Sequence, residues 1–116
     1  MGFLASPLGA DVAKARGETV LAEPARAAAQ WVRAQGQPVR SYRFAQVPAR
    51  WRQPGPGPGA AHATDLPYVC GTLAAPHGAD RIDESDRLCS EVMQAAWVAS
   101  AREGDPGAMD HPGLTR

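Results

Sequence analysis

Apolar residues recur with a helical period in two separate stretches of this chain. In the first, residues 19–35, they are spaced three or four positions apart, which places them on one face of a helix. The stripe consists of Leu21, Pro24, Ala28, Trp31 and Val32. Pro24 falls in the first turns, where its missing N–H does least harm, and Gly36 is placed to end the helix. We therefore predict a helix here, with Trp31 in the core.

The second periodic stretch covers residues 86–102. Its apolar residues form two adjacent rows, Cys89-Met93-Trp97 and Leu88-Val92-Ala96. Together the rows make a face wide enough to lie against a sheet, with Trp97 in the core. Asp83 or Ser85 is placed to cap the helix, and Asp86 in its first turn favours the helix dipole. The sequence Gly104-Asp105-Pro106 is expected to end it.

The segments around these helices follow other patterns. Residues 38–44 predict a strand, although Arg40 and Ser41 interrupt its apolar residues and favour a place near the edge of a sheet. Residues 53–59 alternate proline and glycine, which prevents ladder pairing and predicts a loop. Residues 1–16 show no clear period, so their structure stays uncertain.

Charge and composition narrow the possible functions. The net charge is zero, which gives no overall attraction to nucleic acid or to an anionic membrane. Residues 1–58 carry eight basic and three acidic groups, and residues 59–116 carry four and nine, an asymmetry typical of a solvated surface. No apolar stretch is long enough to cross a membrane, and residues 1–5 do not match a signal peptide. The localisation of the protein stays open.

Three further kinds of site are disfavoured by the residue pattern. The spacing of His62, Cys70, His77 and Cys89 matches no zinc site. Arginines alternate with aromatic residues in 40–44 and 50–52, as in proteins that bind single-stranded nucleic acid. With zero net charge, a strand and a loop explain this pattern better. The two cysteines are too few for a disulfide framework. We expect His77 and His111 to be solvated loop residues.

His62 is the candidate for catalysis. It follows the Pro/Gly loop and precedes the short apolar run Leu66-Pro67-Tyr68-Val69. Imidazole is the side chain best matched to proton transfer near neutral pH, because its ordinary pKa is about 6.5. Serine hydrolases of the α/β type carry their general base on a loop that follows a strand.

Four motifs in order give the chain its resemblance to a known family. They are Gly17-Glu18-Thr19-Val20 with Glu23-Pro24-Ala25-Arg26, Gly36-Gln37-Pro38-Val39 with Tyr42-Arg43-Phe44, the segment around His62, and Met93-Trp97-Val98-Ala101 with Gly104-Asp105-Pro106. This arrangement resembles the C-terminal part of the type-B carboxylesterases, the para-nitrobenzyl-type esterases and their cholinesterase relatives. Ala63 and Asp65 stand where many members have glycine and glutamate. Cys70 stands at a usual phenylalanine, so we expect it to be a small buried hydrophobic residue.

The resemblance implies an α/β fold. Residues 1–116 would form the C-terminal segment of one α/β-hydrolase domain, with a helix, a strand, a histidine loop and a closing helix. The sheet would be incomplete in this chain, and the missing N-terminal part of the same fold would be a partner.

The resemblance also implies a function, hydrolysis of a small-molecule carboxylic ester without metal or organic cofactor. His62 would be the general base of a triad of serine, acid and histidine. None of the serines lies in a Gly-x-Ser-x-Gly motif, and none of Asp11, Glu18 and Glu23, the acidic residues upstream of His62, matches the triad acid. This chain alone would then be inactive. The alternatives are a non-catalytic interaction module derived from an esterase and, on the arginine and aromatic cluster alone, a small nucleic-acid-binding protein.

Overall fold

The computed structural model describes residues 18–55, 57 and 59–115. The chain divides into two compact units. One contains the residues up to Ser41 together with Gln53–Pro58, and the other contains Tyr42–Arg52 together with Gly59–Arg116. Residues 1–16, for which no structure was predicted, lie outside the described part. Each unit is described by itself below.

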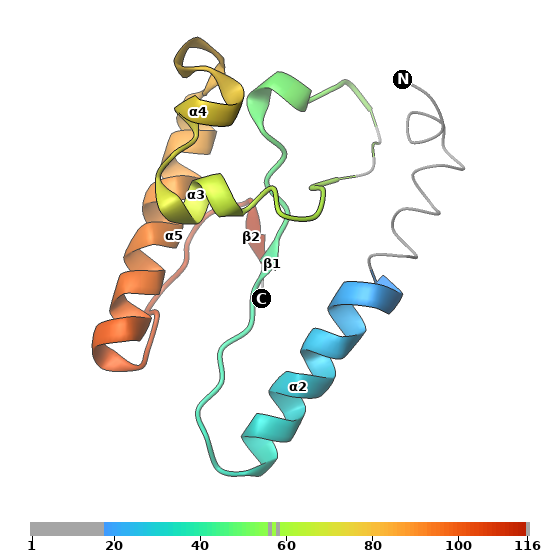
Figure 1. The fold of residues 1–116 in the computed structure, drawn as a ribbon, viewed down its shortest axis with the longest axis vertical. Helices are drawn as coiled ribbons and strands as arrows, with labels where there is room; N and C mark the ends of the chain where they lie inside the picture. Colours follow the sequence, from blue (N-terminus) through green and yellow to red (C-terminus); the bar gives the residue numbers. More distant parts are fainter. Residues whose placement is uncertain (1–17, 56, 58, 116) are drawn as a thin grey trace. The chain divides into compact units, whose positions relative to one another are not determined.

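The first unit contains the predicted N-terminal helix. A π-helical turn, η2 (Glu18–Ala22), leads into the α-helix α2 (Glu23–Ala34), which begins with Pro24 in its first turn (Figure 1). Gly36 follows with a φ of 78°, in the left-handed region that glycine enters most easily. The prediction of a helix over 19–35 is confirmed.

The expectation that Trp31 lies in the core is wrong. Its side chain is 66% exposed, and α2 buries none of its residues. The physical reason is that η2 and α2 are the only regular elements among the described residues of this unit. An amphipathic stripe is buried only where another element packs against it.

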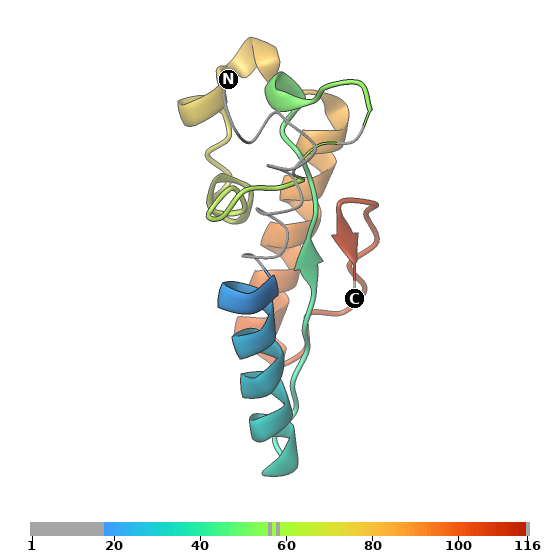
Figure 2. The same ribbon diagram turned by 90° about the vertical axis from the view of Figure 1, so that its right-hand side faces the viewer.

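The second unit is organised around the long helix α5 (Glu84–Glu103), which confirms the helix predicted over 86–102. Asp83 is its cap, because its side chain accepts a hydrogen bond from the Asp86 backbone N–H at 2.8 Å. Gly104, with a φ of 74°, ends the helix. In Figures 1 and 2, α5 runs beside the β1–β2 pair, with α3 and α4 near its N-terminal half.

The buried face of α5 differs in part from the predicted rows. It consists of Asp86, Cys89, Ser90, Met93 and Ala96. Leu88 is 44% exposed and Trp97 53% exposed, so the expectation that Trp97 lies in the core is wrong. Trp97 sits at the edge of the buried face, where its indole N–H donates to the Tyr42 hydroxyl at 3.2 Å. An indole with its polar edge satisfied in this way is stable while half-exposed.

The predicted strand is much shorter than expected. Only Arg43–Phe44 form β1, and they pair with β2 (Leu114–Thr115) in an antiparallel register, Arg43 opposite Thr115 and Phe44 opposite Leu114. The prediction of a strand over 38–44 is therefore wrong for residues 38–42, which have no ladder partner among the described residues. The predicted α/β fold appears here as mostly helical structure with one small antiparallel sheet, consistent with a fragment of that fold.

The core of the second unit lies between α5, the sheet and the short helix α3 (Leu66–Cys70). Its buried apolar residues are Tyr68, Leu73, Cys89, Met93 and Leu114. The other short elements are η3 (Ala49–Trp51), α4 (Ala74–His77) and η4 (Ala79–Arg81). Cys70 is exposed, which corrects the expectation of a buried residue. Two residues span about 200° of a helix, so α3 cannot turn both Tyr68 and Cys70 inward.

Candidate functional site

His62 lies on a four-residue turn, 62–65, between the Pro/Gly-rich loop and α3. This confirms the prediction that His62 occupies irregular structure ahead of the apolar run, although Leu66 to Val69 continue as a helix. The side chain is exposed, and none of the described residues makes a hydrogen bond to its ring. The imidazole is therefore accessible to a proton donor or acceptor from outside this segment.

The turn has an unusual backbone position next to the histidine. Ala63 has a φ of 65°, and it is the only described residue other than glycine with a positive φ. For a residue with a Cβ this conformation costs about 1–2 kcal/mol, because the Cβ crowds the following carbonyl oxygen. Glycine, which has no Cβ, adopts this conformation without that cost.

We predict that Ala63→Gly raises the free energy of unfolding by about 0.5–1 kcal/mol, since the relieved strain exceeds the added backbone entropy. Urea unfolding followed by circular dichroism measures the change. Ala61→Gly is the matched control, because Ala61 lies in the same segment with an ordinary φ and should lose stability instead. Equal losses in both variants would contradict the assigned conformation of Ala63.

Backbone hydrogen bonds join the turn to α3. The Thr64 N–H donates to the Ala61 carbonyl at 3.2 Å, and the Leu66 N–H donates to the Ala63 carbonyl at 3.3 Å. Within the helix, the Val69 N–H donates to the Asp65 carbonyl at 3.0 Å. Thr64 itself is buried. The backbone that carries His62 is thus continuous with the first turn of α3.

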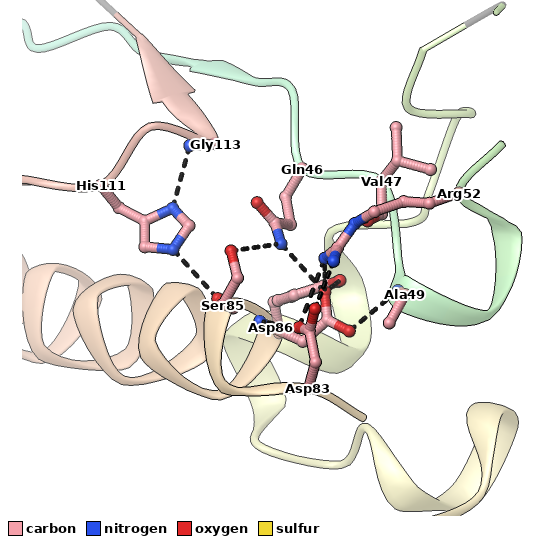
Figure 3. Close-up of polar contacts among 10 residues, drawn as sticks. Gln46, Val47, Ala49, Arg52, Asp83, Ser85, Asp86, His111 and Gly113 are labelled. Atoms are coloured by element: carbon pink, nitrogen blue, oxygen red, sulfur yellow. Dashed lines mark hydrogen bonds and ion pairs between the residues drawn. The ribbon is translucent and has the colours of Figure 1, made fainter. Parts of the chain in front are cut away.

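A buried carboxylate, Asp86, forms the polar centre of this unit (Figure 3). Its side chain is on α5 and the residue is only 2% exposed. Its Oδ1 accepts hydrogen bonds from Tyr68 Oη at 2.7 Å, Gln46 Nε2 at 3.0 Å and Arg52 Nη2 at 3.0 Å. Its Oδ2 accepts one from the Ala49 backbone N–H at 2.9 Å. One carboxylate therefore ties together α3, α5 and the segment after β1.

The same bonds exclude Asp86 from the role of a triad acid. Four donors from α3 and from residues 46–52 already bind this carboxylate, three of them at Oδ1 and one at Oδ2. The Asp86 carboxylate is enclosed in the protein, whereas the His62 ring is exposed. Asp86 is a structural group whose charge Arg52 balances.

Arg52 extends this network to the start of α5. It forms an ion pair with Asp83, the helix cap, and its Nε donates to the Val47 carbonyl at 2.9 Å. The hydrogen bond from Arg52 holds the pKa of Asp83 below its ordinary value. The contribution of Asp83 to stability is therefore present at neutral pH and is lost as the pH falls through that lowered pKa.

His111 is held in place instead of being a solvated loop residue. Its Nδ1 accepts a hydrogen bond from the Gly113 N–H at 2.9 Å, and its Nε2 lies 3.0 Å from the Ser85 carbonyl (Figure 3). Because a carbonyl only accepts, the ring carries its hydrogen on Nε2. His77 also departs from the prediction, since it is 5% exposed in α4 and packs edge-on against Trp51 with ring centroids 5.0 Å apart.

The two cysteines differ in environment. Cys70 is exposed, whereas Cys89 is fully buried beside Asp86 in α5. Burial, reinforced by the charge of Asp86, raises the pKa of the Cys89 thiol to about 11. The thiolate is the reactive form, so Cys89 has almost none of it at pH 8.

We predict that a thiol reagent such as DTNB labels one cysteine quickly in the folded protein and the other at least about 100-fold more slowly. Cys70→Ser should remove the fast reaction, and both cysteines should react alike in urea. Two fast thiols in the folded protein would contradict the burial of Cys89.

Sequence reasoning missed the role of Asp86, which it assigned only to the helix dipole. A signal was present, because Asp86 precedes Cys89 and Met93 at positions i, i+3 and i+7. An acidic residue on the apolar face of a helix is buried, and a buried charge needs partners. The partners Gln46, Ala49 and Arg52 lie 34 to 40 residues away in the sequence, where local patterns do not reach.

The described part of the chain also bears on the metal and nucleic-acid sites considered from the sequence. It contains no group of three or more His, Cys, Asp or Glu side chains placed to hold a metal ion. Arg50 and Arg52 of the arginine and aromatic cluster both bond within the protein, Arg50 to the Pro76 carbonyl at 2.7 Å. None of the helices described is both long and apolar enough to span a bilayer.

Comparison with known proteins assigns the chain to a family. The model of the Carboxylesterase family matches residues 6–114, which is nearly the whole chain. No curated protein and no solved structure matches it. The family match includes the His62 turn, α3 and α5, the elements whose geometry is described above. The chain belongs to the carboxylesterase family.

Proposed function

We propose that the chain is the C-terminal part of a serine hydrolase of carboxylic esters and supplies His62 as its general base. The observation that carries the proposal is the exposed imidazole on the turn before α3, in a chain of the carboxylesterase family. The family points to carboxylic-ester hydrolysis as the reaction. The narrower likeness to para-nitrobenzyl-type esterases is part of the proposal.

The proposed reaction has the two chemical steps of a serine esterase, acylation of the serine and hydrolysis of the acyl-serine. His62 accepts the proton of a serine hydroxyl while that oxygen attacks the ester carbonyl, and it then delivers the proton to the departing alcohol. Water hydrolyses the acyl-serine in a second step, again with His62 as the base. The exposed ring can reach a serine that lies outside the described residues. The proposal assigns the nucleophile, the acid and the oxyanion hole to the N-terminal part of the same fold.

These 116 residues are expected to be inactive by themselves, because the nucleophile and the oxyanion hole are assigned to another part of the fold. They contain no serine in a Gly-x-Ser-x-Gly motif for the base to activate. Without an oxyanion hole, about 2.7–4 kcal/mol of transition-state stabilisation is also missing. The isolated chain should hydrolyse 4-nitrophenyl butyrate no faster than free imidazole at the same concentration.

The test compares the isolated chain with the chain joined in frame to its upstream coding sequence. If that sequence encodes a Gly-x-Ser-x-Gly segment, the joined protein should show saturable hydrolysis and the isolated chain should not. Saturable turnover by the isolated chain that survives repurification would refute the division of the site between two parts. An upstream sequence unrelated to hydrolases would favour the non-catalytic interaction module.

A further inference from the structure

We infer that the contact between Tyr68 and Asp86 positions the turn that carries His62, so that both act as positioning residues for the reaction. The inference rests on the proposed function of His62. It concerns residues that touch neither the substrate nor the histidine ring.

The hydrogen bonds described between α3 and α5 all involve one residue, Tyr68. Tyr68 is fully buried, and its hydroxyl donates to Asp86 Oδ1 at 2.7 Å. The Ser90 hydroxyl, one turn further along α5, donates to the Tyr68 carbonyl at 2.7 Å. Phe44 of β1 packs edge-on against the Tyr68 ring, with centroids 5.1 Å apart. Both ends of Tyr68, its hydroxyl and its carbonyl, are therefore held by α5.

The backbone of the turn is hydrogen-bonded to α3. The N–H of Leu66, the first residue of α3, bonds back to Ala63, and the Val69 N–H bonds to Asp65. None of the described residues holds the His62 ring itself. The position of the imidazole therefore depends on the backbone of the turn, and that backbone is bonded to α3, which Tyr68 anchors on α5.

An anchored turn would keep the general base in position for proton transfer. A general base must lie within hydrogen-bond reach of the proton that it takes. A displacement of 1 Å can cost about 100-fold in rate. Burial and the hydrogen bond to Asp86 raise the pKa of Tyr68, so its hydroxyl keeps its proton and remains a donor at working pH.

The test measures exchange of backbone amide hydrogens in the full chain. Tyr68→Phe removes only the hydroxyl and keeps the ring in contact with Phe44. The amides of Thr64 and Leu66 should then exchange about tenfold faster, because local opening becomes easier. The His62 ring resonance should shift or broaden, while that of His111, held by Ser85 and Gly113, should not.

Tyr42→Phe is the matched control. It removes a hydroxyl that lies against the same core and accepts from the Trp97 indole, with no hydrogen bond to α3 among the described residues. Exchange at Thr64 and Leu66 should stay unchanged in this variant. An equal increase in both variants would show general loosening of the core and would overturn the inference, as would no increase in Tyr68→Phe.

A second variant covers the case in which Tyr68→Phe does not fold. Ser90→Ala removes the other tie of α3 and places a good helix former in α5. It should also speed exchange at Thr64 and Leu66, and unchanged exchange would overturn the inference.

The catalytic part of the inference has its own readout. In the joined enzyme, Tyr68→Phe should lower kcat with KM unchanged, and Tyr42→Phe should leave both unchanged. Faster exchange with an unaltered kcat would overturn the positioning role. Failure of the proposed function itself has a different signature, since His62→Ala would then leave kcat intact.

Discussion

Replacing Asp86 with alanine is expected to lower the free energy of unfolding by about 2–6 kcal/mol, from four lost hydrogen bonds at about 0.5–1.5 kcal/mol each. Arg52 is 39% exposed and keeps its ion pair with Asp83, so its charge adds little to this cost. The variant also leaves the Tyr68 hydroxyl buried without an acceptor, and an unsatisfied buried group costs about 1–3 kcal/mol. The Gln46 amide keeps its hydrogen bond to the Ser85 hydroxyl. Because a domain of this size has about 5–15 kcal/mol of stability, the variant should be close to unfolding at room temperature.

Urea unfolding followed by circular dichroism measures this effect. Asp110→Ala is the control, since Asp110 is an exposed carboxylate in the same unit and should change stability by less than about 0.5 kcal/mol. The midpoint for Asp86→Ala should fall sharply while that for Asp110→Ala stays in place. Similar midpoints in the two variants would mean that Asp86 does not hold the unit together.

The helices were predictable from the sequence because their signals are local. The period of apolar residues, the Asp83 cap and the glycines at 36 and 104 lie within or next to each helix. Each of these features acts within about one helical turn of its own position. The turn at His62 was predictable for the same reason, because the Pro/Gly loop before it permits no regular structure.

The strand and the exposed tryptophans were not predictable in this way. A strand needs a partner, and Arg43 of β1 finds its partner, Thr115, 72 residues further along the chain. Residues 38–42 have strand-like chemistry but no ladder partner in the described part of the chain. Trp31 belongs to the apolar stripe of its helix, but no further regular element among the described residues of its unit covers that stripe.

Part of the candidate site was predictable from the sequence, and part was not. The place of His62 ahead of α3 follows from its neighbours in sequence, whereas the Asp86 network joins residues from 46 to 86. A buried carboxylate was readable from its position on an apolar helix face, but its partners were not. His111 was misjudged because its partners, Ser85 and Gly113, are bonded through the backbone, and any residue type has a backbone.

The second large effect concerns His62 in the joined enzyme. His62→Ala should lower kcat for a short-chain nitrophenyl ester by about 10⁴-fold or more, since loss of the base leaves the serine unactivated. KM should change little, because the imidazole acts on the serine proton and contributes little to substrate binding. His77→Ala and His111→Ala serve as comparisons, because those rings are engaged in packing and hydrogen bonds inside the unit.

The most direct measurement is therefore kcat for 4-nitrophenyl butyrate in the joined enzyme and in its three single histidine-to-alanine variants. We expect that His62→Ala alone abolishes turnover of the folded enzyme, and circular dichroism of each variant verifies that it is folded. Turnover that persists in a folded His62→Ala enzyme but disappears in a folded His77→Ala or His111→Ala enzyme would contradict the assignment of His62 as the base.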